Sequence, residues 1–460
     1  MFVCDISKNT ELTDVARLFY GDGFPHISVA ENNGVFAVCV NGKTYEFTYT
    51  DPLFDIIPAE HKLGRLSKIA LYDALVRYTD KSMPWGALTG VRPTKLFYEC
   101  LRAGQSPEQA QQTMQNAYRV SESRAGILRE ITEAQKGKIY YAPEYYNLYV
   151  HIPYCTTRCT YCSFVSAPIG KNIEQSRAYV KLLCDEIIRS VDFLYAHGKK
   201  ILSVYIGGGT PTALDETALN ELLTAIGKLD CEYTCEAGRP DTVTAEKADI
   251  MKEHGVTRVC VNPQTLNDRT LAAIGRSHSA QQFYTAYDTI AARGFDINCD
   301  LIAGLDGETV EDFIKSFEGV RALSPQNITV HSLSKKNGSA IRYDDGENRQ
   351  TSAMLEYALF NRGKYRPYYL YRQKRQAGNL ENVGFSVIGK ECVNNITTME
   401  ETVGVMACGA GAISKIVGDG NITRFANMRD VPLYMSRYEE KIAAKLDCFA
   451  GIFNKTDKCE

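Results

Sequence analysis

The sequence predicts an α/β fold in which a partial (βα)6 barrel follows an N-terminal α+β domain and precedes a C-terminal extension. Three observations predict it: a hairpin pattern with helices near the start, strand–helix alternation in the middle, and the end of that alternation in the last quarter. Strands alternating with helices over short connections imply right-handed βαβ units and a parallel sheet. We expect the three parts to span residues 1–138, 139–345 and 346–460.

The N-terminal part carries local signals for a hairpin and for helices. Two β-rich runs, 35–40 and 43–49, are joined by Asn41-Gly42, which tolerates the positive φ angles of a type I′ turn. Apolar spacing over 66–78 predicts a helix. Ser106-Pro107-Glu108-Gln109 is a capping box with proline at the first helical position, so a second helix is expected to begin there. The turn-rich segment 84–95 holds the only tryptophan; a functional loop is one interpretation, and we favour a segment that packs this domain against its neighbour.

The middle part contains six candidate βα units, which favours a partial barrel over a closed eight-stranded one. In such barrels the chemistry lies at the carboxyl ends of the strands. The C-terminal region is expected to lie over the barrel mouth as a lid and to end in a helix near 430–446. The predicted strands are 146–152, 201–206, 231–237, 256–262, 295–302 and 327–333, and the predicted helices are 173–196, 214–228, 244–254, 279–293 and 308–323.

Bulk composition excludes several classes of protein. The chain has 460 residues, 44% hydrophobic and 23% charged, with a net charge of −3, so nothing indicates a nucleic-acid or membrane-surface partner. No window approaches 18 uninterrupted apolar residues, so membrane insertion is not expected. The start lacks the basic flank and hydrophobic run of a signal peptide. Fifteen cysteines without a regular framework then predict a cytoplasmic, reducing location.

Three cysteines, Cys155, Cys159 and Cys162, occupy the loop after the first predicted barrel strand. Thiolate ligands select iron–sulfur clusters, zinc or copper(I). A structural zinc site needs a fourth ligand, usually from a second Cys or His pair, and Ser163-Phe164-Val165 follow instead. Three thiolates can hold three irons of a [4Fe–4S] cube and leave the fourth iron open. We favour this cluster over a structural zinc and over three ordinary thiols.

The Cys-x3-Cys-x2-Cys spacing, with Tyr161 before the last cysteine, resembles the signature of radical S-adenosylmethionine (SAM) enzymes. In that family SAM occupies the open iron through its amino and carboxylate groups. The resemblance therefore implies two cofactors, a [4Fe–4S] cluster and SAM. It also implies sensitivity to oxygen.

Glycines and polar residues recur where later barrel strands end. The second strand runs into Gly207-Gly208-Gly209-Thr210-Pro211-Thr212, where consecutive glycines can let a ligand approach backbone N–H groups, although a tight turn also explains them. Its position resembles the GGxPT-like motif with which radical SAM enzymes contact the SAM amino group. Polar groups that could bind ribose hydroxyls and the SAM carboxylate, or could act only as capping or solvated residues, are Glu236, Gln264, Arg276 and Asp300.

Together these motifs resemble the oxygen-independent coproporphyrinogen III oxidase (coproporphyrinogen dehydrogenase) family over roughly 145–340. Segments 367–372 and 378–382 also resemble its HemZ-type variant, which has an extra N-terminal domain. The resemblance implies an oxidoreductase of porphyrin and heme biosynthesis that decarboxylates coproporphyrinogen III to protoporphyrinogen IX, with a tetrapyrrole substrate and a low-potential electron donor. It implies that Cys155, Cys159 and Cys162 bind the cluster, and that SAM is contacted by Tyr149, Tyr161, Gly208, Gly209, Thr210, Glu236, Gln264, Arg276 and Asp300.

One departure from the family pattern bears on the substrate. The strict oxidase branch follows its third cluster cysteine with Gly-Cys, whereas Ser163-Phe164 follow here. Sister branches, including a heme-trafficking relative, are closer to the Ser-Phe pattern. A heme-binding trafficking protein and a radical SAM enzyme with an unrelated substrate are therefore the alternatives.

Three further features have a structural and a functional interpretation. Cys231 and Cys235 form a second Cys-x3-Cys, but residues four apart along a strand share a face, so we interpret them as structural thiols. His331, near a strand end, could face substrate or be a hydrogen-bonded structural residue. A basic group could pair with tetrapyrrole carboxylates, although a solvated face is the default interpretation; it comprises Lys335, Lys336, Arg372, Lys374 and Arg375.

Overall fold

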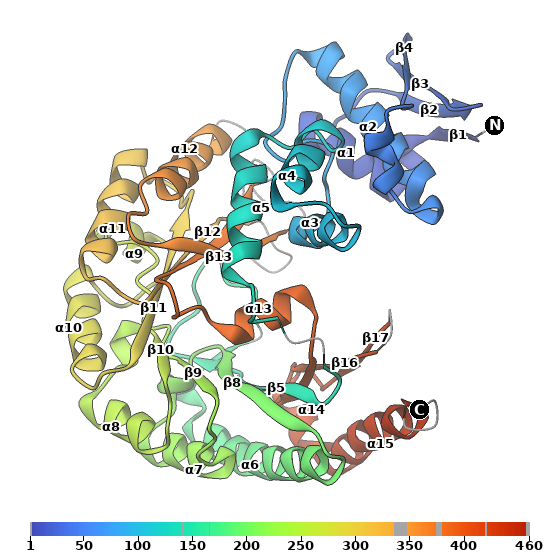
Figure 1. Ribbon diagram of the computed structural model, residues 1–460. Coiled ribbons are helices and arrows are strands. Elements are labelled where there is room, and N and C mark those ends of the chain that lie inside the picture. The colour runs from blue at the N-terminus through green and yellow to red at the C-terminus, as the bar shows by residue number, and fades with distance from the viewer. Residues whose placement is uncertain are drawn as a thin grey trace. The chain divides into compact units, whose positions relative to one another are not determined.

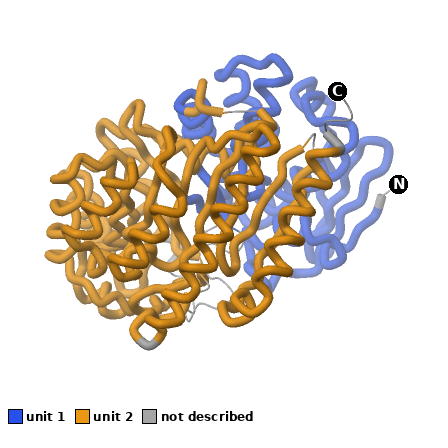
Figure 2. Tube along the Cα trace, turned by 90° about the horizontal axis from the view of Figure 1, so that it is seen from below, with its two compact units in different colours: residues 1–134, 370–382 blue, residues 135–369, 383–460 orange. Residues whose placement is uncertain are grey.

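The chain forms two compact units. The structure is a computed structural model that describes residues 2–139, 142–164, 166–334, 347–373, 380–418 and 421–456. Unit 1 comprises Met1–Ala134 and Leu370–Asn382, and unit 2 comprises Gln135–Tyr369 and Val383–Glu460 (Figure 2). Among the described residues, no helix is both long and apolar enough to cross a membrane. The three-part division at 138 and 345 stays a prediction.

Unit 1 combines an antiparallel sheet with five helices. Asn41 and Gly42 have φ angles of 48° and 83°, which confirms the predicted hairpin turn. Ser106 forms the predicted capping box with Gln109 at the start of the fourth helix. The sheet follows chain order, β1 (Phe2–Asp5), β2 (Ile27–Asn32), β3 (Val35–Val40) and β4 (Lys43–Thr48). The helices are α1 (Thr10–Tyr20), α2 (Ala59–Thr79), α3 (Pro93–Arg102), α4 (Pro107–Asn116) and α5 (Glu122–Ala134).

Residues from late in the chain, among them Arg372 and Glu381, contribute to the interior of unit 1. Trp85 is fully buried, and its indole N–H donates to a carboxylate oxygen of Glu381 at 2.6 Å. The other carboxylate oxygen of Glu381 lies 2.8 Å from Nε of Arg124, which is also buried. Trp85 therefore packs, as predicted, but its partner Glu381 belongs to the same compact unit and not to a neighbouring one.

Arg372 belongs to this buried group and is not part of a solvated face. Its side chain is 3% exposed, Nη1 donates to the carbonyl oxygen of Leu88 at 2.7 Å, and the guanidinium lies 5.3 Å from the centre of the Trp85 ring. The default interpretation of the basic group as solvated is therefore wrong for Arg372. The other members, Lys335, Lys336, Lys374 and Arg375, lie outside the described residues.

Unit 2 contains the predicted partial barrel. Six neighbouring parallel strands form its wall, and helices cover their outer side (Figure 1). The sheet order has two ends, so the barrel is open, as predicted. The strands, in order, are β5 (Tyr145–Ile152), β8 (Lys200–Gly208), β9 (Glu232–Glu236), β10 (Arg258–Cys260), β11 (Asp296–Ala303) and β12 (Asn327–Ser332). The helices are α6 (Ile173–Ala196), α7 (Glu216–Ile226), α8 (Ala245–Glu253), α10 (Ala280–Ala291) and α11 (Val310–Ala322), with a short α9 (Asp268–Ala273) that was not predicted.

The described part of the C-terminal region extends the barrel wall. A seventh parallel strand pairs with β5, and an antiparallel strand pairs with β12 at the other side. The last helix contacts α6 on the outside of the barrel, so the expected lid is wrong for this helix; that other parts of the C-terminal region cover the mouth stays a prediction. The elements are α12 (Glu347–Phe360), β13 (Arg366–Arg372), β14 (Glu381–Ser386), α13 (Val393–Glu400), β15 (Gly404–Cys408), β16 (Ile413–Val417), β17 (Ile422–Ala426), α14 (Val431–Ser436) and α15 (Tyr438–Thr456).

Lys445 of α15 and Glu186 of α6 form a buried ion pair that attaches the last helix to the barrel. Their side chains are 0% and 3% exposed, and Nζ lies 2.6 Å from the carboxylate. Glu186 also accepts hydrogen bonds from the Asn427 amide at 2.8 Å, the Tyr434 hydroxyl at 2.5 Å and the N–H of Gly409 at 2.8 Å. Burial alone would raise the pKa of Glu186, but Lys445 and these donors hold it below its ordinary value.

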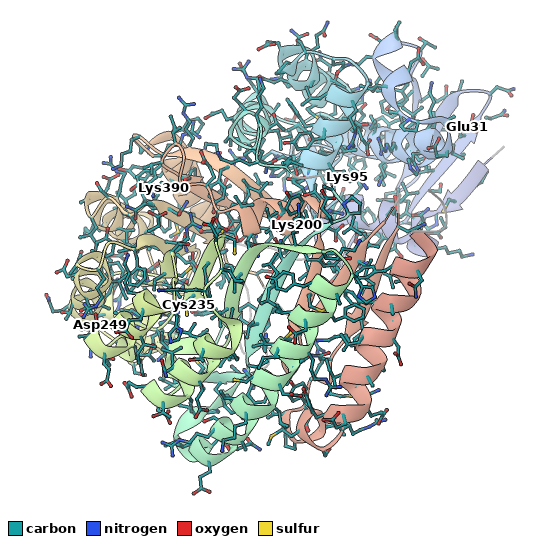
Figure 3. The ribbon with its side chains drawn as sticks, turned by 60° about the horizontal axis from the view of Figure 1, so that its bottom comes forward. Glu31, Lys95, Lys200, Cys235, Asp249 and Lys390 are labelled. Atoms are coloured by element: carbon teal, nitrogen blue, oxygen red, sulfur yellow. The ribbon has the colours of Figure 1, made fainter. Side chains whose placement is uncertain are left out.

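The second cysteine pair fits its structural interpretation. Cys235 on β9 is fully buried. Figure 3 shows it inside unit 2, behind the helical layer whose exposed outer surface is marked by Asp249 of α8. Burial raises the pKa of Cys231 to about 11 and that of Cys235 further. The reactive thiolate form is therefore disfavoured at both positions.

Glu308, before α11, makes the stability of unit 2 depend on pH. Its side chain is buried, and burial raises its pKa from 4.5 to about 7 although the Thr265 hydroxyl donates to it. The folded protein binds more protons than the unfolded chain between these values, so stability falls as pH rises across them. We expect Glu308→Gln to reduce this loss by roughly 1 to 3 kcal/mol, measured as unfolding free energy at about pH 5 and pH 8. Glu311→Gln, on an exposed side chain of α11, is the control and should keep the wild-type pH dependence; an unchanged profile in Glu308→Gln contradicts the prediction.

Candidate functional site at the carboxyl ends of the barrel strands

The loop with three cysteines leaves the carboxyl end of β5. It begins with the short strand β6 (Tyr154–Cys155), which pairs with β7 (Ala167–Pro168). Cys155 and Cys159 are 8% and 7% exposed, and Cys162 is half-buried. The N–H of Cys162 donates to the carbonyl oxygen of Cys159 at 3.1 Å, which closes a turn between the last two cysteines.

The glycine run at the end of β8 packs directly on the backbone that leads into this loop. Gly208 has a φ of 104°, and a Cβ there would lie 2.8 Å from the carbonyl oxygen of Ile152. A Cβ on Gly209 would lie 2.2 Å from the carbonyl oxygen of Tyr154. The N–H groups of Gly209 and Thr210 donate to these same two oxygens, each at 2.7 Å. The glycines are therefore required for a close approach of chain to chain just before the first cysteine.

Arg276 supports the loop from the segment after α9. Its side chain is 8% exposed, and Nη1 donates to the carbonyl oxygens of Asn262 at 2.7 Å and Gly238 at 3.0 Å. Nε and Nη2 donate to the Tyr161 hydroxyl at 3.3 and 3.2 Å. Burial raises the pKa of Tyr161, so its hydroxyl stays protonated and accepts these bonds. Arg276 thus places a fixed positive charge beside the cysteine loop.

Two partly buried carboxylates lie on β9 and β11: Glu236 is the last residue of β9, and Asp300 lies three residues before the end of β11. Glu236 accepts hydrogen bonds from the Tyr205 hydroxyl and from the Asn262 amide, the latter at 3.1 Å. The Asn262 side-chain oxygen accepts from the N–H of Asp300 at 3.2 Å, so Asn262 connects the end of β9 with β11. His331 Nε2 lies 3.6 Å from the Asp300 carboxylate, which identifies a partner for this histidine.

The surroundings shift the pKa values of Glu236 and Asp300 in opposite directions. Burial raises the pKa of Glu236 to about 7, and the nearby charge of Asp300 adds to this shift. Burial would also raise the pKa of Asp300, but His331 and the Asn298 amide outweigh it and hold the value below its ordinary one. Near neutral pH, Asp300 is therefore an acceptor-only carboxylate, and Glu236 is poised between its two forms.

Gln264 and Tyr149 complete the set of predicted cofactor-binding residues. Gln264 has a φ of 68°, and its N–H donates to the carbonyl oxygen of Asp300 at 2.9 Å. Its side-chain oxygen is buried and has no hydrogen-bond partner within the described part of the chain, so it is an unfilled acceptor there. The Tyr149 hydroxyl lies 3.2 Å from Nδ1 of His151, and its ring stacks on Tyr205 with centres 6.3 Å apart.

Four of the predicted residues belong to two hydrogen-bonded groups that meet at Asn262. One contains Arg276 and Tyr161, and the other contains Glu236 and Asp300. Sequence reasoning missed three participants, although each had a detectable signal. The missed residues are Tyr205, opposite Tyr149 in the β5–β8 register, Asn262, two residues before Gln264, and Arg239, three residues after Glu236.

The residues at the loop suit an iron–sulfur cluster. Among the described residues, no three Cys, His, Asp or Glu side chains are grouped closely enough to hold a single metal ion. In a cube each thiolate binds a different iron, so its ligands need not converge on one point. Arg239 donates to Sγ of Cys159 at 3.4 Å, and the Thr210 hydroxyl lies 3.3 Å from Sγ of Cys155. Such donors and a positive charge stabilise thiolates and an anionic cluster.

Comparison with known proteins identifies relatives of the chain. The radical SAM superfamily model matches residues 149–319. The oxygen-independent coproporphyrinogen-III oxidase-like protein HemZ of Bacillus subtilis is 36% identical over 403 residues, which cover 84% of this chain and 80% of HemZ. The heme chaperone HemW of Lactococcus lactis is 31% identical over 318 residues, or 65% of this chain and 78% of HemW.

A solved structure shares the fold. Coproporphyrinogen III oxidase (HemN) from Escherichia coli, a radical SAM enzyme, superposes with a TM-score of 0.53 at 21% identity. The match covers 67% of this chain and 73% of HemN. Membership of the superfamily implies a [4Fe–4S] cluster and SAM, which fits the cysteine loop. The chain therefore belongs to the radical SAM superfamily and, within it, to the family of coproporphyrinogen-III oxidase-like proteins of the HemZ type.

Proposed function

We propose that this protein is an oxidoreductase that converts propionate side chains of coproporphyrinogen III to vinyl groups without oxygen. Each conversion removes one hydrogen atom, one electron and CO2, and two conversions give protoporphyrinogen IX. The cluster and SAM, when bound, supply a 5′-deoxyadenosyl radical that abstracts hydrogen. A low-potential donor is needed for the cluster, and a further acceptor takes the electron left by decarboxylation.

The observation that carries this proposal is the position of the cysteine loop beside the buried polar groups at the strand ends. Cys155, Cys159 and Cys162 would hold the cluster. The open acceptor of Gln264 and the ionised carboxylate of Asp300 suit donor groups such as ribose hydroxyls and an amino group. The similarity to HemZ over 84% of the chain supports a tetrapyrrole as the substrate.

The chain's own residues would position the cofactors and exclude water. Arg276 and Tyr161 fix the loop from one side, and the N–H groups of Gly209 and Thr210 fix it from the other. Fixed donors and acceptors reduce the reorganisation that the reaction requires. Glu236, with its raised pKa, can hold or release a proton beside this site near neutral pH.

The test is anaerobic turnover of the reconstituted full chain with SAM, a strong reductant and coproporphyrinogen III. We expect porphyrin products that have lost one or two CO2, identified by mass spectrometry, together with 5′-deoxyadenosine. Omission of SAM is the matched control and should give neither product. Formation of 5′-deoxyadenosine without decarboxylated porphyrin would contradict the substrate and leave the radical chemistry in place.

A specific observation supports a second candidate, a heme-trafficking protein. Ser163 and Phe164 follow the third cysteine, and the Phe164 side chain is 56% exposed. The heme chaperone HemW of L. lactis is 31% identical over 65% of this chain. Stoichiometric heme binding without porphyrinogen turnover would favour this function. Turnover without stable heme binding would favour the oxidase.

A further inference from the structure

Arg239 is a buried arginine that the proposed reaction does not otherwise use. It lies just after β9, and its side chain is 2% exposed. Its three nitrogens point to three different partners. Nε donates to the Asp241 carboxylate at 3.1 Å, Nη2 donates to the Ser277 hydroxyl at 2.9 Å, and Nη1 donates to Sγ of Cys159 at 3.4 Å.

The Arg239–Asp241 pair contacts the cysteine loop at two points. Arg239 reaches Cys159, and the Asp241 carboxylate accepts a hydrogen bond from the Thr156 hydroxyl at 3.2 Å. Asp241 binds the Nε and Nη2 side of the guanidinium, so the cation stands between the carboxylate and the sulfur. The pair is therefore oriented with its positive end toward a predicted cluster ligand.

We propose that Arg239 is a positioning residue that raises the reduction potential of the cluster through its charged hydrogen bond to Cys159. Hydrogen bonds to the sulfurs and the charge nearby are among the factors that set the potential of an iron–sulfur cluster. Reduction adds negative charge to the cluster, and a guanidinium at the ligand sulfur stabilises that charge. The negative charge of Asp241, which binds the Nε and Nη2 side of the guanidinium, partly offsets this stabilisation of the reduced cluster. The inference rests on the cluster assignment and is independent of the porphyrinogen substrate.

The experiment is a potentiometric titration of the reconstituted full chain, followed by electron paramagnetic resonance, without SAM or substrate. Arg239→Gln removes the charge, and we expect it to lower the equilibrium constant for reduction about tenfold, a shift of about 59 mV for one electron. Arg239→Lys keeps the charge, so its reduction potential should fall less than that of Arg239→Gln. Asp241→Asn removes the opposing carboxylate and should move the potential the other way. Iron and sulfide content is measured for each variant.

Arg258→Gln is the matched control. Arg258 is also buried, at 4% exposure, and also binds a carboxylate, that of Glu232 at 2.7 Å, but it starts β10 at the opposite end of the strands. Its loss should lower stability and leave the potential unchanged. An unchanged potential in iron-replete Arg239→Gln, equal shifts in Arg239→Gln and Arg258→Gln, or a downward shift in Asp241→Asn would each overturn the proposal. If Arg239→Gln binds no iron, the opposite shift expected of Asp241→Asn decides. None of these readouts depends on porphyrinogen turnover.

Discussion

Replacing Cys155, Cys159 and Cys162 together with alanine is expected to abolish cluster binding. Iron–sulfur clusters are held by cysteine thiolates, and alanine offers no ligand atom. The triple variant should bind no cluster after anaerobic reconstitution, measured as iron, sulfide and broad visible absorbance. It should also form no 5′-deoxyadenosine from SAM, because the electron for that cleavage comes through the cluster.

A control variant separates loss of the cluster from general damage. Cys231→Ala and Cys235→Ala together remove the second Cys-x3-Cys pair. Cys231 directly precedes β9 and Cys235 lies within it, and burial raises the pKa of both thiols. This variant should retain a full complement of iron, with some loss of stability from the shortened Cys235 side chain. A full cluster in the triple variant would refute the assignment of the cysteine loop.

Lys445→Met is expected to cause a large loss of stability. The substitution leaves Glu186 buried without its cation, which costs about 3 to 5 kcal/mol when one partner of a buried pair is removed. The remaining donors to Glu186, from Asn427, Tyr434 and Gly409, reduce this cost. We expect the midpoint of thermal unfolding to fall by several degrees, measured by calorimetry.

Two further variants test the cause of this loss. Lys445→Met combined with Glu186→Gln removes both charges and should be more stable than Lys445→Met alone, because the uncompensated charge is gone. Lys441→Met removes a partly exposed lysine from the same helix, whose ammonium lies 3.5 Å from Glu440, and should change stability by less than about 1 kcal/mol. Equal losses in Lys441→Met and Lys445→Met would show that the buried pair is not the cause.

The barrel could be predicted because its signals are local. Each βα unit is a β-rich run followed by a helical apolar pattern, and all six predicted strands exist, with β10 shortened from 256–262 to Arg258–Cys260. The position of β15 beside β5 could not be predicted, because residues 404–408 pair with 146–150 across more than half the chain. The predicted helix near 430–446 is interrupted between α14 and α15, and nothing in the apolar spacing indicated that break.

The candidate site could be predicted in part for the same reason. Parallel strands bring their carboxyl ends to one edge, so Glu236 and Asp300 at two strand ends were expected near each other. The contact between Arg239 and Cys159 was not predictable, since it depends on how two separate loops are folded over the strand ends. The position of the glycine run at the end of the second strand was also predicted. The sequence did not indicate that the backbone of Ile152 and Tyr154 packs against these glycines.

The interior of unit 1 joins residues that the ribosome makes far apart in time. Trp85 and Glu381 are separated by 296 positions, and Arg124 depends on the same carboxylate. The first 134 residues can emerge and begin to fold while that carboxylate has not yet been synthesised. A nascent or truncated N-terminal fragment would therefore bury an arginine without its counter-ion, and we expect it to mature only after nearly the whole barrel has been translated.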